Sequence, residues 1–150
     1  MILEILLMVE KVSLLVYEII KKAQSAKTKA EKIKILQENA CPALKDVLRG
    51  TYDDLVQWHL PPGAPPYEPA NEDSLPSNLH RQHIQFKYFV KGLAGDEVNS
   101  IRRERMFITM LEAIHPQDAE LLIIMKDKGN LGGGITKKLV QEAFPNLIVK

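Results

Sequence analysis

NSIRRERMFITMLEAIHPQDAELLIIMKDKG, residues 99–129, contains two helical patterns joined by a His-Pro step. Apolar residues recur every three or four positions on both sides of the step, which is the period of an α-helix. Pro116 suits the first turn of a helix, so we expect one helix over about 99–114 and a second one beginning at Pro116. Asp118 lies near the start of the second helix and Lys126 near its end, where the helix dipole favours these charges. Two adjoining helices predict an all-α fold.

The sequence before this stretch carries further helix signals. Thr28 and Glu31 have the spacing of a capping box, which predicts the start of a helix. Pro42 suits the first turn of another helix, and Gly50 is expected just past its end. Ser77 begins a fourth helix that continues to the next glycines. With one helix at each end of the chain, these signals predict a bundle of about six or seven helices.

The N-terminal sequence MILEILLMVEKVSLLVYEIIKK, residues 1–22, is the most apolar part of the chain. Charged residues interrupt it, and its longest apolar run covers only residues 5–9, so it does not predict a membrane span. On a helical projection its charged residues fall within an arc of roughly 120°, and a membrane-surface helix is disfavoured because that arc is not notably basic. So wide an apolar face predicts a central core helix, or a first helix that joins two copies of the chain in a homodimer.

Six of the nine prolines lie within residues 61–76. Proline removes a backbone donor and fixes φ, so we expect an extended, proline-rich arm. The P-x-x-P spacings at 62–65 and 66–69 also match a polyproline ligand, although any proline-rich run contains such spacings. The favoured prediction is an arm that lies across its own domain, anchored by Trp58 and Tyr67.

The sequence GNLGGGITKK, residues 129–138, comes within one residue of a phosphate-binding loop. Ile135 stands where that motif requires a lysine, and no buried parallel strands precede it, so a nucleotide site is rejected. Gly129 suits the end of the preceding helix, and Thr136 suits the N-cap of the last one. Residues 129–135 are therefore predicted to form a mobile glycine hinge.

Length and composition indicate an ordinary soluble domain. A chain of 150 residues, 45% hydrophobic and 26% charged, fits one domain over residues 1–150. The formal net charge of +1 gives no global attraction to nucleic acid. Cys41 is the only cysteine, so an intrachain disulfide is excluded and a reducing compartment fits.

No catalytic motif stands out. His80 and His83 lie one helical turn apart, which two metal ligands can use, but no third ligand follows at a fixed spacing. We therefore predict no metal, no cofactor and no catalytic residue, and expect the protein not to be an enzyme. An enzyme that uses His80, His83 and nearby acids is kept as a third hypothesis. It would be ruled out if these side chains shared no pocket.

Basic clusters are the remaining candidates for a binding site. Cations on helices can contact a phosphate backbone or an acidic protein, although a solvated helix face is the simpler explanation. The clusters would favour nucleic acid if the fold brought them to one side. The candidates are Lys21, Lys22, Lys27, Lys29, Lys32 and Lys34 in the first cluster, Arg102, Arg103 and Arg105 in the second, and Lys137 and Lys138 at the start of the last helix.

Two long blocks of the chain resemble a known family. They are AKTKAEKIKILQENACPALKDVLRGTYDDLVQWHLPPGAPPYEP, residues 26–69, and RRERMFITMLEAIHPQDAELLIIMKDKGNLGGGITKKLVQEAFPNLI, residues 102–148. The chain resembles small uncharacterised proteins of T4-like tailed phages, including cyanophages, over about residues 13–147. The resemblance implies a viral protein in the host cell cytoplasm and transfers no catalytic residue. Residues 1–12 look like an N-terminal extension beyond the family's usual start.

These observations lead to two main hypotheses about function. The first is a non-enzymatic phage accessory protein that binds a phage or host macromolecule during infection, either nucleic acid or the proteins that act on it. The second is a minor virion or assembly component, suggested by the arm and by the apolar first helix.

Overall fold

The computed structural model describes residues 14–148, and these contain seven α-helices and two short 3₁₀ helices. The only β-pairing in this range consists of two isolated bridges. The prediction of an all-α, single-domain fold is therefore confirmed. The expected extension at residues 1–12, and with it most of the apolar N-terminal segment, lies outside the described residues. None of the helices in residues 14–148 is long and apolar enough to cross a membrane.

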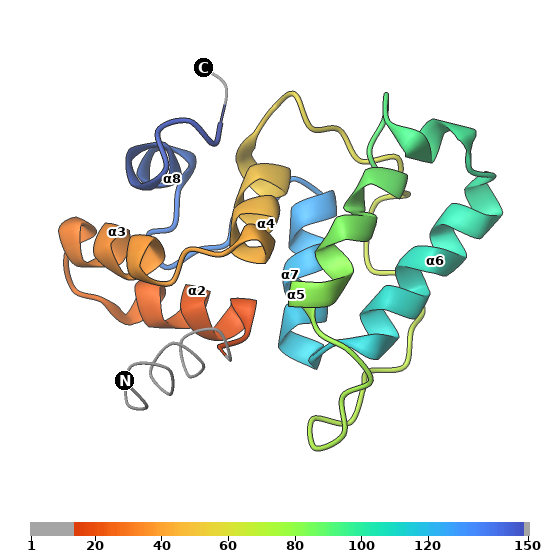
Figure 1. Cartoon of the computed structure of the whole chain (residues 1–150), viewed down its shortest axis with the longest axis horizontal. Coiled ribbons are helices and arrows are strands. Elements are labelled where there is room, and N and C mark those ends of the chain that lie inside the picture. The colour runs from red at the N-terminus through yellow and green to blue at the C-terminus, as the bar shows by residue number, and fades with distance from the viewer. Residues whose placement is uncertain (1–13, 149–150) are drawn as a thin grey trace, which may run out of the picture.

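The helices are arranged along one long axis (Figure 1). One end holds α2, α3 and α8, the centre holds α4 and α7 packed against each other with α5 in front of α7, and the far end holds α6. The bounds are Val16–Ser25 for α2, Lys29–Glu38 for α3, Pro42–Tyr52 for α4, Leu79–Gln82 for α5, Ser100–Ala113 for α6, Pro116–Lys126 for α7 and Lys137–Ala143 for α8. The 3₁₀ helices are η1, His83–Tyr88, and η2, Ala94–Glu97.

A single apolar core runs through all these layers. The fully buried side chains include Ile20 from α2, Leu44 from α4, Leu111 from α6 and Leu122 from α7. Every α-helix contributes at least one buried apolar residue, so the elements form one cooperative unit.

The helix starts follow local sequence chemistry. The Thr28 hydroxyl accepts from the Glu31 backbone N–H at 3.2 Å, as expected of an N-cap. The Glu31 carboxylate, however, accepts from the backbone of Lys27 and not of Thr28. The Thr136 hydroxyl caps α8 in the same way.

The predicted end of α4 at Gly50 was wrong. The helix continues to Tyr52, and Gly50 is buried inside it. A Cβ added at Gly50 would lie 2.5 Å from the Trp58 ring, and the Trp58 indole N–H donates to the Gly50 carbonyl at 2.9 Å. The glycine is thus needed for close contact with Trp58 and not for a helix stop.

The predicted fourth helix was also only partly right. It is divided into α5 and η1, and it ends at Tyr88 because the chain after Tyr88 pairs with the segment around Trp58. The His59 backbone N–H donates to Phe89 O at 2.6 Å, and Lys91 N–H donates to Gln57 O at 2.8 Å. This contact between distant segments outweighs the helical period of the sequence.

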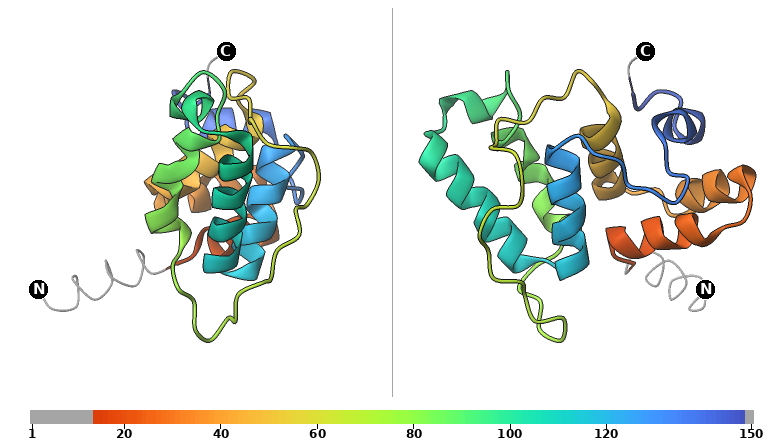
Figure 2. Two further views of the ribbon diagram at one scale, coloured as in Figure 1. Left: turned by 90° about the vertical axis from the view of Figure 1, so that its right-hand side faces the viewer. Right: turned by 180° about the vertical axis from the view of Figure 1, so that it is seen from behind.

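The proline-rich arm lies along the outside of α6 and α7 (Figure 2). The Lys126 ammonium donates to Pro61 O at 2.9 Å, and the Gly63 backbone N–H donates to the Asp127 carboxylate at 3.1 Å. Further along, the Glu68 backbone N–H donates to the Glu112 carboxylate at 2.9 Å. The arm is therefore held by its own domain at several points.

The end of α7 differs from the prediction that Gly129 would take the terminal left-handed position. Lys128 takes it instead, with φ 54°. The Lys128 N–H donates to Met125 O and the Gly129 N–H to Ile124 O, which is the Schellman pattern. Its left-handed residue is Lys128, one position before the predicted Gly129. The Lys128 ammonium donates to Gly50 O at 2.9 Å and to Asp53 O at 2.6 Å, so it caps the C-terminal end of α4. These bonds offset the backbone cost of a non-glycine residue at positive φ.

The glycine loop is tied to the core by Tyr52. Its hydroxyl donates to Ile135 O and accepts from Leu131 N–H at 3.1 Å. The Gln24 amide donates to Leu131 O at 3.0 Å from the other side. Both ends of the glycine run are thus held, and the mobility of the hinge at residues 129–135 stays a prediction.

Candidate partner-binding site

Lys32 belongs to the predicted lysine cluster, but the fold uses it internally. Its ammonium donates to Ala23 O, Gln24 O and Ala26 O at 3.2, 2.9 and 2.8 Å. These carbonyls form the C-terminal end of α2, where a cation is favoured by the helix dipole. Lys32 therefore holds α2 against α3 and presents no free donor to a partner.

Two other candidate lysines form ion pairs. Lys29 contacts the Glu142 carboxylate at 2.7 Å and joins α3 to α8. Lys137 contacts the Asp54 carboxylate at 2.9 Å, and this hydrogen bond lowers the pKa of Asp54 below its usual value. Both pairs are solvent-exposed, so each contributes little stability, but both reduce the charge available to a partner.

The remaining lysine candidates are exposed: Lys21, Lys22, Lys27, Lys34 and Lys138. Lys21 lies over the Tyr17 ring at 5.4 Å, and Lys34 approaches Glu38 at 3.8 Å, so neither is tightly held. They give the α2–α3–α8 end of the molecule a basic but interrupted surface.

Arg103 is a structural residue. Its side chain is only 4% exposed, and its guanidinium donates to Gly95 O at 3.0 Å, Val98 O at 2.7 Å and His59 O at 3.3 Å. It thereby joins α6 to η2 and to the start of the arm. We exclude it from the binding surface. Its position four residues before Phe107, on the buried row of α6, was the sequence signal that separates it from its neighbours.

Arg102 and Arg105 have a different environment. Both are exposed, and both line a groove of about 720 Å³ between α6 and the α5–η1 segment. The groove is lined from α6 by Asn99, Ile101, Arg102, Arg105, Met106, Thr109, Met110 and Ala113, and from the opposite side by Gln82 and Gln85. It therefore combines an apolar floor with a cationic edge.

Charge is sorted between two sides of α6. Arg102 and Arg105 line the groove, whereas Glu104 lines a separate cavity beneath the arm, and Glu112 binds the backbone of the arm. No carboxylate lines the groove, and neither Arg102 nor Arg105 forms an ion pair within residues 14–148. The groove is consequently an electropositive surface.

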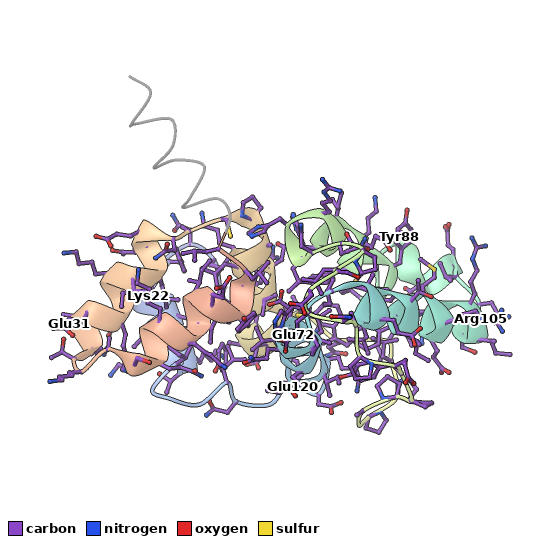
Figure 3. The ribbon with its side chains drawn as sticks, turned by 90° about the horizontal axis from the view of Figure 1, so that it is seen from below. Lys22, Glu31, Glu72, Tyr88, Arg105 and Glu120 are labelled. Atoms are coloured by element: carbon purple, nitrogen blue, oxygen red, sulfur yellow. The ribbon has the colours of Figure 1, made fainter. Side chains whose placement is uncertain are left out.

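The two basic clusters lie at opposite ends of the molecule. Figure 3 shows Lys22 at one end and Arg105 at the other, with Glu72 and Glu120 between them. The sequence left open whether the clusters share one side, and the fold separates them. A single track of phosphate contacts over both clusters is not available on this surface.

One comparison with known proteins gives a match. The model of a family of unknown function, DUF6433, matches residues 19–131, which is about three quarters of the chain. The chain belongs to this family. No curated protein and no solved structure matches it. The DUF6433 match includes the whole groove beside α6 and leaves out α8 with Lys137 and Lys138.

His80 and His83 line one cavity of about 380 Å³ together with Cys41, so the enzyme hypothesis is not ruled out by separation of the histidines. Each ring nevertheless makes a hydrogen bond that fixes it in the fold. His80 Nε2 lies 2.7 Å from Leu14 O, and His83 Nδ1 lies 2.6 Å from an Asp46 carboxylate oxygen. No group of three metal-ligating side chains exists within residues 14–148.

Asp118 is a residue whose role the sequence analysis missed. It was expected to serve its own helix, α7, but its carboxylate accepts the backbone N–H of Tyr17 at 2.8 Å and so caps α2. The Tyr17 ring stacks on His115 at 4.4 Å between centroids, and His115 in turn caps α7. Burial raises the pKa of Asp118 to about 6. No local sequence pattern predicts a contact between residues so far apart in the chain.

Proposed function

We propose that this chain is a non-enzymatic accessory protein of a T4-like tailed phage that binds a protein partner in the host cell cytoplasm during infection. The observation that carries the proposal is the groove beside α6, where Arg102 and Arg105 edge an apolar floor. Specific protein interfaces combine such an apolar centre with a polar rim. The phage origin rests on the sequence resemblance, and the groove supports a protein as the partner class.

A protein fits this surface better than nucleic acid does. Phosphate binding gains from many cations along one track, whereas here the fold uses Lys32 and Arg103 internally and pairs Lys29 and Lys137 with acids. The exposed candidate lysines lie on α2, α3, α8 and the α2–α3 connection, at the end of the molecule opposite to α6. We favour a protein of the phage or host nucleic-acid machinery over nucleic acid itself.

Affinity purification of the tagged full chain from infected cells tests the proposal. Two charge-reversal variants are compared with the wild type: Arg102→Glu with Arg105→Glu at the groove, and Lys22→Glu with Lys27→Glu at the opposite end. We expect to recover a protein whose association with the tagged chain persists after nuclease treatment. The lysine variant should recover the same protein. Recovery of no protein above the level of a mock-tagged control would contradict the proposed function.

Direct titration with nucleic acid separates the competing explanation. If phosphates are bound, the logarithm of the affinity falls linearly with the logarithm of salt concentration. We expect no binding to single- or double-stranded nucleic acid at low salt. Binding with a steep salt dependence that the lysine variant abolishes would replace the protein partner by nucleic acid.

The virion hypothesis was based on the apolar first helix and on an arm that could extend onto a neighbouring subunit. Pro61 O, the Gly63 N–H and the Glu68 N–H are instead bonded to the chain's own α6 and α7 region. We therefore expect the protein to be absent from purified particles. Mass spectrometry of purified virions checks this, and stoichiometric presence there would reverse the choice.

A further inference from the structure

The groove beside α6 has the length of a helix. Its lining residues on α6 extend from Asn99 to Ala113, so the wall is the full helix, about 21 Å long at 1.5 Å per residue. Gln82 and Gln85 form the opposite wall. A straight helical wall presents its side chains in rows three and four residues apart, and the element that packs into such rows best is another helix.

The floor and one edge of the groove are apolar. Met106, Met110 and Ala113 form its inner part, and Ile101 is 67% exposed at its mouth. Methionine side chains adapt to the shape of an incoming side chain, and exposed isoleucine gains when a partner covers it. The occupant must therefore offer an apolar face of its own.

The charges specify the second property of the occupant. Arg102 and Arg105 face the groove without a carboxylate among its lining residues, while Glu104 and Glu112 lie toward the arm. Guanidinium groups pair with carboxylates in a two-pronged geometry that lysine cannot reproduce. The occupant should carry Asp or Glu beside its apolar face.

We infer that this groove binds one amphipathic α-helix of a partner protein, with apolar residues at i, i+3, i+4 and i+7 and carboxylates flanking them. The inference rests on the proposed function and names the chemistry of the partner. Recognition of this kind lays the apolar stripe of a helix into a groove and uses the rim charges for orientation.

The test uses the full chain and a designed helical peptide of about 14 residues, which spans about 21 Å. The peptide carries leucines at the four stripe positions and glutamates beside them. A scrambled peptide keeps the composition without the stripe, and a third peptide replaces glutamate by lysine. Affinity is measured by fluorescence anisotropy, and the bound surface by changes in the amide chemical shifts of the protein. We expect the first peptide alone to bind and to shift the amides of α6 and α5–η1.

Matched variants locate the contact. Arg102→Glu with Arg105→Glu is expected to weaken the designed peptide about tenfold or more, which corresponds to about 1.4 kcal/mol. Ile101→Ser is expected to weaken it several-fold. Lys22→Glu with Lys27→Glu controls for charge, and Ile84→Ser controls for loss of an exposed isoleucine, because Ile84 is 66% exposed but does not line the groove. Both controls should bind as the wild type does.

Two outcomes overturn the inference. One is that the designed peptide shifts no groove amide, or binds no better than the scrambled one. The other is that the controls weaken it as much as the groove variants do. The proposed function fails separately, if no protein is recovered from infected cells above the mock-tagged control. If a partner is recovered equally by the wild type and by the Arg102→Glu, Arg105→Glu variant, the protein has a partner but the groove is not its site.

Discussion

Asp118 accepts the backbone N–H of Tyr17 at 2.8 Å, so a carboxylate that is 101 residues away in the sequence caps the first described helix. The Asp118 side chain is buried, and its second oxygen accepts no hydrogen bond from the described residues. His80 and His115 lie near enough to favour its charged form, but burial outweighs them and raises its pKa to about 6. This hydrogen bond links α2 to α7, and the charge of its acceptor changes when Asp118 is protonated.

The first prediction concerns the pH dependence of stability. Between the usual pKa of 3.8 and about 6, the folded chain retains a proton on Asp118 that the unfolded chain has released. The stability contributed by this proton is complete below 3.8 and is lost as pH rises through about 6. The side chain at position 118 in the Asp118→Asn variant never carries the charge. The free energy of unfolding of this variant should therefore rise by about 2 kcal/mol relative to that of the wild type between about pH 4.5 and pH 7.5. Urea denaturation of both proteins across this range measures the difference.

The control for this prediction is the difference itself. Groups distant from Asp118 contribute equally in both proteins, so their effects largely cancel when the two unfolding free energies are subtracted. A difference that stays constant with pH would show that Asp118 titrates at an ordinary pKa.

The second prediction concerns Lys128, whose ammonium binds the Gly50 and Asp53 carbonyls at the end of α4. Lys128→Met keeps much of the side-chain volume but leaves both carbonyls without this donor, so we expect a loss of about 1–3 kcal/mol. Lys22→Met, on an exposed lysine, should change stability by less than about 0.5 kcal/mol. Equal effects of the two substitutions in chemical denaturation would exclude the capping role.

The third prediction separates two adjacent arginines. Arg103→Met removes the donors to three buried or half-buried carbonyls and should cost about 3 kcal/mol or more. Arg102→Met should cost less than about 0.5 kcal/mol, because Arg102 is exposed. Thermal unfolding followed by circular dichroism compares them. A small effect at Arg103 would mean that water replaces its guanidinium.

The fourth prediction tests the glycine loop. Gly132 and Gly133 both have positive φ, so alanine at either position costs about 1 kcal/mol in backbone strain. A Cβ at Gly133 would also lie 2.5 Å from the Gln24 side chain, whose amide bonds to Leu131 O, whereas a Cβ at Gly132 meets open space. Gly133→Ala should therefore be the more destabilising by about 1 kcal/mol. Hydrogen exchange at Leu131 measures this, and equal exchange in both variants would contradict it.

Sequence periodicity was sufficient for the elements that depend on local chemistry. The helices α6 and α7 lie within a residue or two of the ranges expected from the stretch around Pro116, and Thr136 caps α8 as expected. The all-α fold follows from such local patterns because each helix needs only its own stripe and caps.

The parts that failed depend on contacts between distant segments. The end of η1 at Tyr88 follows from the bridge of Trp58 to Val90, and Gly50 is explained only by the Trp58 ring against it. Among the cations, Lys32 cannot be separated from its exposed neighbours without the carbonyls that it binds, and Arg103 is set apart only by its spacing to Phe107. The groove beside α6 likewise could not be predicted from the sequence, because its two walls come from segments that the sequence does not place together.

The order of residues along α6 gives its groove a direction. Arg102 and Arg105 both lie in the first half of the helix, whereas Met110 and Ala113 lie in the second half. A bound helix would then meet cations at one end and uncharged side chains at the other, which makes its two opposite orientations unequal in energy. A partner helix whose carboxylates cluster at one terminus would bind this surface in one orientation. The domain that follows the helix in the partner would then always lie on the same side of the molecule.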